Sequence, residues 1–119
     1  MKTNKKVINF KTETKVLNFF SSLADPTRLK ILLSMADEPR SVNEIYRIVG
    51  REKMTLSAIS HQLRQLKDMG IVSYEKKGRE KLFKLSNDFC WCILKDAFKQ
   101  FNTNIEIRCE KCSNGGKKK

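Results

Sequence analysis

The stretch Thr55–Val72 constrains the fold of this chain more than any other part of the sequence. Ile59, Leu63 and Leu66 recur at helical spacing, so they predict an apolar stripe on a short helix that packs against a core. The other face offers donors and acceptors that suit base edges and phosphates, at Ser57, Ser60, His61, Arg64 and Gln65. The two faces predict a helix that packs into the core on one side and binds a polar partner, such as nucleic acid, with the other.

Size and charge narrow the choice of partner. A length of 119 residues suits one compact domain. The chain has 25 Lys+Arg, 13 Asp+Glu and a formal net charge of +12, which attracts polyanions such as nucleic acid. Residues 40–84 hold eleven of the basic and five of the acidic residues, which is half of the net charge. Terminal lysines such as Lys117–Lys119 are typical of solvated ends that add sequence-independent affinity for DNA.

Several classes of protein are disfavoured by what the sequence lacks. It has no apolar run long enough to span a bilayer and no signal-peptide stretch, so we expect a cytoplasmic protein with no membrane partner. Cysteines in that compartment are reduced by default. With one histidine, no paired carboxylates on a shared apolar face and no phosphate-cradling glycine loop, the chain is not expected to be an enzyme.

Capping residues divide the first half of the chain into four helices. An apolar pattern at Val16, Leu17, Phe20, Leu23 and Ala24 predicts the first helix. Asp25 and Pro26 start the second helix, Ser41 and Glu44 form a capping box for the third, and Thr55 caps the fourth. The third helix ends at Gly50 and the fourth at Gly70. Two short helices joined by a turn, the second with a polar face, predict a helix-turn-helix.

A β-hairpin is predicted after Gly70. Residues 71–75 and 81–85 are rich in β-forming side chains and flank the turn Lys76–Arg79. The tip of this hairpin is strongly basic, and because it follows a helix-turn-helix directly we expect it to contact phosphates or the minor groove.

A last helix, capped by Ser86 or Asn87, is apolar on more than one face. Its large side chains are Phe89, Trp91, Ile93, Leu94, Phe98 and Phe101. One small core cannot cover all of them, and the first helix has a similar surplus at Phe19 and Phe20. We therefore expect a homodimer formed through the first and last helices. The predicted division is a DNA-binding and dimerisation domain over residues 1–102 and a polar, basic, cysteine-containing tail over residues 103–119.

Three motifs in this order resemble the ArsR/SmtB family of winged-helix repressors: Leu23–Leu32, Ser57–Leu63 and Asp68–Val72. The resemblance implies a mainly α fold with a small β-hairpin (α+β), about five helices and a two-stranded wing. It implies a dimeric, sequence-specific repressor that binds a pseudo-palindromic operator and is released by an effector. The alternative is a winged-helix module for protein assembly or general nucleic-acid binding, without an effector.

The predicted contacts with double-stranded DNA are Thr55, Ser57, Ser60, His61, Arg64, Lys76, Lys77 and Arg79. Ser57, Ser60 and His61 fall on the DNA-facing serines and histidine of the family. Two departures affect the start of the helix. The loop Arg51–Lys53 makes the turn about three residues longer than is usual in the family. Leu56 stands where a polar residue is common, and it either contacts a thymine methyl group or packs internally.

The family's effector sites are not found in the sequence. Its Cys-x-Cys motif on the third helix has no counterpart in residues 40–45, and the zinc-binding pattern of its last helix is missing from residues 87–89 and 100–103. The candidates that remain are four thiols, which could bind zinc or trivalent arsenic: Cys90, Cys92, Cys109 and Cys112. Residues two apart on a helix point about 200° apart, which disfavours joint ligation by Cys90 and Cys92. A redox switch remains open, as does a purely structural role in which Cys90 is a small buried hydrophobe.

Overall fold

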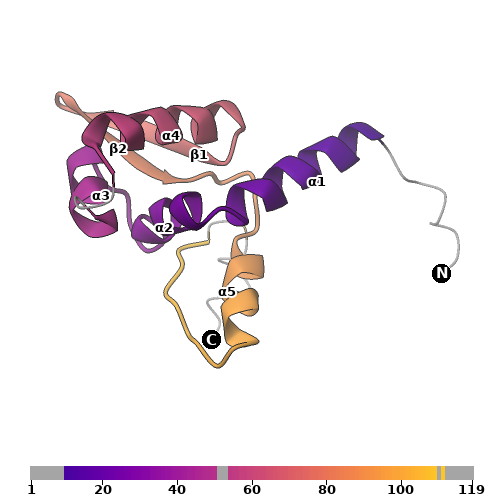
Figure 1. The fold of residues 1–119 in the computed structure, drawn as a ribbon. Helices are drawn as coiled ribbons and strands as arrows, with labels where there is room; N and C mark the ends of the chain where they lie inside the picture. Colours follow the sequence, from indigo (N-terminus) through magenta and orange to yellow (C-terminus); the bar gives the residue numbers. More distant parts are fainter. Residues whose placement is uncertain (1–9, 51–53, 110, 112–119) are drawn as a thin grey trace, which may run out of the picture.

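A computed structural model describes residues 10–50, 54–109 and 111. Figure 1 shows α2, α3 and α4 gathered with the hairpin, while α1 extends away from this body and α5 projects from it. The described elements are α1 (Phe10–Leu23), α2 (Pro26–Ser34), α3 (Val42–Val49), α4 (Leu56–Asp68), β1 (Val72–Lys77), β2 (Glu80–Leu85) and α5 (Cys92–Lys99). The predicted winged-helix arrangement is confirmed. Within the described ranges, no helix has the length and apolar character needed to cross a membrane.

The predicted caps start three of the helices. The Asp25 carboxylate accepts a hydrogen bond from the Thr27 N–H at 3.0 Å. Ser41 and Glu44 form a reciprocal capping box, with bonds of 3.2 and 2.9 Å. The Thr55 hydroxyl accepts from the backbone N–H of Ala58 at 3.0 Å. These bonds satisfy N–H groups that the helix itself leaves without partners, so local sequence fixes where α2, α3 and α4 begin.

The wing is an antiparallel hairpin in a fixed register. Val72 pairs with Leu85, Tyr74 with Phe83 and Lys76 with Lys81. Gly78, in the turn, has a φ of 67°, a left-handed conformation that glycine adopts without steric penalty. An isolated bridge joins Arg40 to Phe83 through two backbone hydrogen bonds of 2.9 and 2.7 Å, and it connects the start of α3 to β2.

The apolar stripe of α4 lies in the core, as predicted. Ile59, Leu63 and Leu66 are each no more than 1% exposed. They share one cluster with residues of α2, α3, the wing and the start of α5, among them Ile31, Leu32, Ile45, Ile71, Phe83 and Trp91. The hydrophobic effect therefore holds α4 by one side only, and its polar side faces outward.

Most of the stripe predicted for the first helix lies outside this core, and of its members only Leu23 packs against it, partly buried. Val16, Leu17 and Phe20 are 45%, 60% and 49% exposed, whereas Phe19 and Ser22 are buried. Figure 1 shows why, because α1 meets the rest of the chain only near its C-terminal end. Val16, Leu17 and Phe20 on α1 are therefore left largely uncovered by the part of the chain that the structure describes.

The predicted start of the last helix is wrong. α5 begins at Cys92, after a turn in which the Ser86 hydroxyl accepts from the Asp88 N–H at 3.1 Å. Trp91 occupies the N-cap position without a side-chain cap bond, and its indole N–H donates to the Ser86 carbonyl at 2.8 Å. Burial of Trp91, which is 1% exposed, fixes this turn against the core, so a tertiary contact overrides the local cap signal.

The segment after α5 returns to the body of the molecule. Ile105, Ile107 and Cys109 pack against the core cluster. The Arg108 N–H donates to the carbonyl of Ala36 at 2.8 Å. These contacts place residues 105–109, the returning segment, beside the end of α2 and the start of α5.

Candidate functional site

The outward face of α4 carries most of the predicted DNA contacts. Ser57, His61 and Arg64 are exposed, and Ser60 is half-buried on the same helix. Ser57, His61 and Arg64 lie opposite the buried stripe and Ser60 lies at its edge, so these side chains are available to a partner that approaches this face. Thr55 is also exposed, but its oxygen already accepts the cap bond from Ala58, which leaves the hydroxyl hydrogen as its free donor.

A polar contact that the sequence did not reveal ties α4 to α2. The Arg28 Nε donates to the side-chain oxygen of Gln62 at 3.2 Å, across 34 residues of chain. Arg28 also lies 3.8 Å from Asp25, the residue that caps α2. Both residues lie within motifs that carry the family resemblance, which was the only sequence signal for this contact. The bond fixes how α4 is rotated relative to α2, and therefore where its outer face points.

A hollow of about 340 Å³ joins the face of α4 to the wing. It is lined by Val42, Ser60, Arg64, Lys67, Asp68, Tyr74, Lys81 and Phe83. Three of these side chains are cationic and only one is anionic, so the hollow attracts anions. The Nζ atoms of Lys67 and Lys81 lie 5.6 and 4.7 Å from the centre of the Tyr74 ring, within cation–π range. The sequence did not identify Lys67, Tyr74 and Lys81 as candidate site residues.

The basic tip of the wing is exposed, as its residue types suggest. Lys76, Lys77 and Arg79 all lie on the surface. Lys76 is directly opposite Lys81 in the strand register, and like charges in such a pair repel each other. A bound anion would relieve that repulsion. Lys81 also lines the hollow, so the wing and the hollow form one continuous cationic surface that suits a phosphate backbone.

Three of the four candidate thiols come together at the start of α5. The sulfur atoms of Cys90, Cys92 and Cys109 all lie within 4.8 Å of one another. The Trp91 backbone N–H points at the Cys109 sulfur at 3.2 Å. Cys112 lies outside the described residues.

Two sequence-based arguments about Cys90 are therefore wrong. Cys90 precedes α5, so the angle between residues two apart on a helix does not apply to Cys90 and Cys92. Cys90 is also exposed rather than a buried hydrophobe. The same error, placing the start of the last helix too early, caused both.

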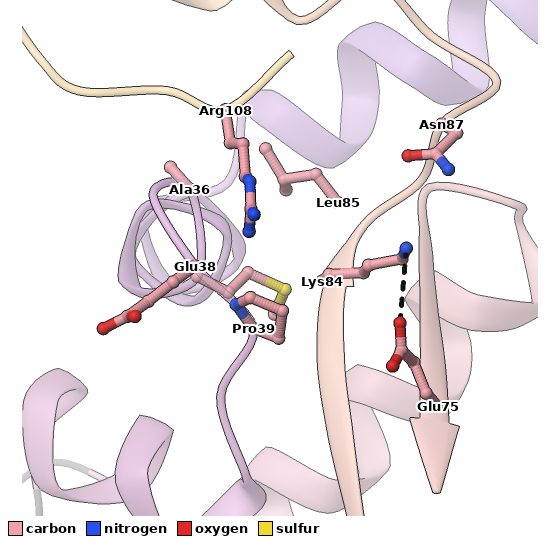
Figure 2. A pocket seen from close by; sticks show the side chains of 9 residues that line it. Ala36, Glu38, Pro39, Glu75, Lys84, Leu85, Asn87 and Arg108 are labelled. Atoms are coloured by element: carbon pink, nitrogen blue, oxygen red, sulfur yellow. Dashed lines mark ion pairs between the residues drawn. The ribbon is translucent and has the colours of Figure 1, made fainter. Parts of the chain in front are cut away.

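A second hollow, of about 190 Å³, lies between the α2–α3 connection, the wing and the returning segment. Figure 2 shows Arg108 entering it from the returning segment, opposite Lys84 and Glu75 of the wing. Lys84 and Glu75 form an ion pair at 3.6 Å. Acidic and basic side chains both line this hollow, so it shows no preference for either charge.

Comparison with known proteins supports the same fold and family. Residues 25–74 match the family model described as "Bacterial regulatory protein, arsR family". The transcriptional repressor SmtB homolog of Synechocystis sp. is 32% identical over 82 residues, which are 69% of this chain and 60% of that protein. The transcriptional regulator NmtR of Mycobacterium tuberculosis is 33% identical over 82 residues, 69% of this chain and 66% of that protein. The chain thus spans less than two thirds of the length of either relative.

A solved structure shows the shared architecture. The homodimeric winged helix-turn-helix DNA-binding domain Mb0332 of Mycobacterium bovis superposes with a TM-score of 0.67. The match has 21% sequence identity and covers 85% of this chain and 91% of that domain. Both sequence relatives are named as transcriptional regulators rather than enzymes, as expected for a chain without catalytic motifs.

Proposed function

We propose that this chain, which belongs to the ArsR/SmtB family of winged-helix regulators, is a sequence-specific DNA-binding repressor that acts as a homodimer. One observation carries the proposal. α4 is buried along one side and presents an exposed polar face on the other, continuous with the cationic hollow and wing. That combination of a rigid reading face and a flanking cationic surface is what recognition in a major groove requires.

The residues divide into two roles. Ser57, Ser60 and His61 on α4 contact base edges, and Arg64, one turn further on, contacts a base or a phosphate. Thr55 makes its contact at the start of the same helix. Lys76, Lys77 and Arg79 on the wing bind flanking phosphates. Leu56 is 40% exposed, which leaves its side chain accessible to a thymine methyl group.

The homodimer follows from apolar surface that one chain leaves uncovered. Phe10, Leu17 and Phe20 on α1 and Ile93 on α5 are exposed, as is Phe101 just beyond α5. Burial of such side chains against a second copy yields about 25 cal/mol per Å² of apolar surface. The two α4 helices would then reach major grooves about one helical turn apart, roughly 34 Å, on a pseudo-palindromic operator. In this proposal residues 1–102 bind DNA and dimerise, residues 103–119 form the cysteine-containing tail, and a metal, metalloid or thiol-reactive effector releases the operator.

A pair of double variants tests base reading. Ser60→Ala with His61→Ala is expected to reduce operator affinity more than affinity for random DNA, because base contacts carry the sequence preference. Lys77→Ala with Arg79→Ala should weaken both and lower the slope of log affinity against log salt by about 1 per lost phosphate contact. The measurement is fluorescence anisotropy over a salt series. Equal losses on both DNAs for the α4 pair would contradict the proposal.

The competing function is a winged-helix module that assembles proteins or coats nucleic acid without choosing a sequence. Selection of bound fragments from a random DNA pool separates the two. The repressor is expected to enrich a pseudo-palindromic motif, whereas the module enriches none. This selection also supplies the operator for the measurements above.

A further inference from the structure

We propose that Cys90, Cys92 and Cys109 form a three-thiolate site for a soft, thiophilic ion, and that the site joins the returning segment to the start of α5. Three sulfur atoms already lie within 4.8 Å of one another. They come from two stretches of chain that the fold brings together, since Cys109 is 17 positions beyond Cys92. Thiolate donors without a carboxylate or imidazole among them select soft ions over magnesium or calcium.

The surroundings favour ligation at this position. The Trp91 N–H donates toward the Cys109 sulfur at 3.2 Å, and such a donor stabilises the charged thiolate, which is the form that binds metals. Cys90 is exposed, so an ion can reach the cluster from solvent. Zn–S bonds of about 2.3 Å at the tetrahedral angle would place the sulfurs about 3.8 Å apart. Ion binding therefore requires the three sulfurs to close together only slightly.

That closure acts on an aromatic cluster shared with α1. Trp91 lies between two of the proposed ligands, and its ring centre is 5.5 Å from that of Phe19 on α1. Phe89 stacks on Phe19 at 5.0 Å. On the other side, Arg108 precedes Cys109 and anchors its segment to Ala36 at the end of α2. An ion at the three sulfurs thus fixes the positions of α1, α5 and the returning segment relative to one another.

Two ion chemistries share these requirements. Arsenite, As(OH)₃, would react with three thiols to form three As–S bonds, while three As–O bonds break and the thiol protons leave with the hydroxides as three waters. No electrons are transferred in this exchange. Zn²⁺ would bind the three thiolates after loss of their protons and take a fourth ligand from solvent. The oxidation state of the cysteine sulfurs does not change in either case.

The binding experiment needs no DNA. Reduced protein is titrated with arsenite or with Zn²⁺ and followed by native mass spectrometry, by counting thiols that react with Ellman's reagent, and by the fluorescence of Trp91, the single tryptophan of the chain. One ion per chain is expected. Arsenite should protect three of the four thiols, and the fluorescence change should saturate at the same stoichiometry. Zn²⁺ binding without arsenite binding would identify the metal as the ion, and the reverse result would identify the metalloid.

Single substitutions assign the ligands. Cys90→Ser, Cys92→Ser and Cys109→Ser should each weaken binding of the active ion at least about tenfold. Circular dichroism of each variant establishes that it is folded. Failure of both ions to bind, protection of only two thiols, or one of these variants that binds the ion as tightly as the wild type would overturn the site.

The regulatory meaning of the site rests on the proposed function, and a separate measurement tests it. Saturating ion is expected to lower operator affinity at least about tenfold in the wild-type protein and to leave it unchanged in Cys109→Ser. An ion that binds free protein at one per chain without changing operator affinity would overturn the coupling. Absence of operator binding in the ion-free wild type would instead refute the proposed repressor, and the stoichiometry of the free protein would be unaffected by that result.

Discussion

The α2–α4 unit with its wing and the pair formed by α1 and α5 differ in how completely one chain buries them. In the first region the apolar stripe of α4 is buried, and Ile31 and Ile45 from α2 and α3 are fully covered. In the second region Leu17 and Phe20 are about half exposed, and Phe101 beyond α5 is 81% exposed. The first region is a finished domain core, whereas the second is a surface that a second copy would complete. The unit proposed to read DNA therefore buries its core within one chain, while the spacing of two such units on DNA would depend on a second copy.

The largest expected effect is loss of the finished core. Leu63→Ala should lower the free energy of unfolding by about 3 kcal/mol, because Leu63 is 1% exposed and truncation leaves a cavity. Leu56→Ala is the matched control on the same helix. Leu56 is 40% exposed, and its truncation should lower the free energy by less than about 1 kcal/mol. Urea unfolding followed by circular dichroism measures both, and equal losses would show that α4 is not packed through one face.

The next effect concerns the uncovered surface of α1. Leu17→Asp with Phe20→Asp should convert the proposed dimer to a monomer, because each chain would bury two charges at the interface. Operator affinity should then fall about 10- to 100-fold, which is about 1.4 to 2.8 kcal/mol.

Analytical ultracentrifugation measures the oligomeric state of this variant. Ile48→Asp is the control, since Ile48 is 54% exposed on α3 and lies outside the proposed interface. It should leave the dimer intact. A double variant that stays dimeric would remove α1 from the interface and would weaken the contrast between the two regions.

A smaller effect is expected at the start of α4. Thr55→Ala should lower the free energy of unfolding by about 1 kcal/mol, because the Ala58 N–H loses its cap. Thr55→Ser keeps an acceptor at the same place and should recover most of the loss. Thermal unfolding of the three proteins gives the comparison. A Ser variant as unstable as the Ala variant would show that the methyl group, rather than the cap bond, stabilises this end.

The smallest effect is expected on the wing. Glu75→Gln removes the partner of Lys84 in an ion pair of 3.6 Å, and the Glu75 side chain is 59% exposed. Solvent screens such pairs, so the change in the free energy of unfolding should stay below about 0.5 kcal/mol. The same urea assay measures it. A loss above about 1.5 kcal/mol would mean that the mixed-charge hollow of Figure 2 stabilises the fold.

Sequence predicted the finished region well because its signals are local. Asp25, Ser41 and Thr55 bond backbone groups two or three residues away, so their helices could be located from spacing alone. Residues around α5 depend on contacts distant in sequence. Trp91 is placed by burial in the core, and Cys109 reaches Trp91 across 18 positions. Spacing carries no information about such contacts, which is why the helix start was predicted wrongly and why joint ligation by Cys90 and Cys92, proposed from residue type, was judged unfavourable.

The bridge between Arg40 and Phe83 also bears on the solubility of the chain. A two-stranded hairpin has unpaired backbone groups along its outer edges, which another chain can use to extend the sheet. At Phe83 the outer N–H and carbonyl of β2 are already bonded to Arg40, at 2.7 and 2.9 Å. The bridge thus blocks strand addition in the middle of β2, and it lets an exposed, basic hairpin avoid aggregation through that edge.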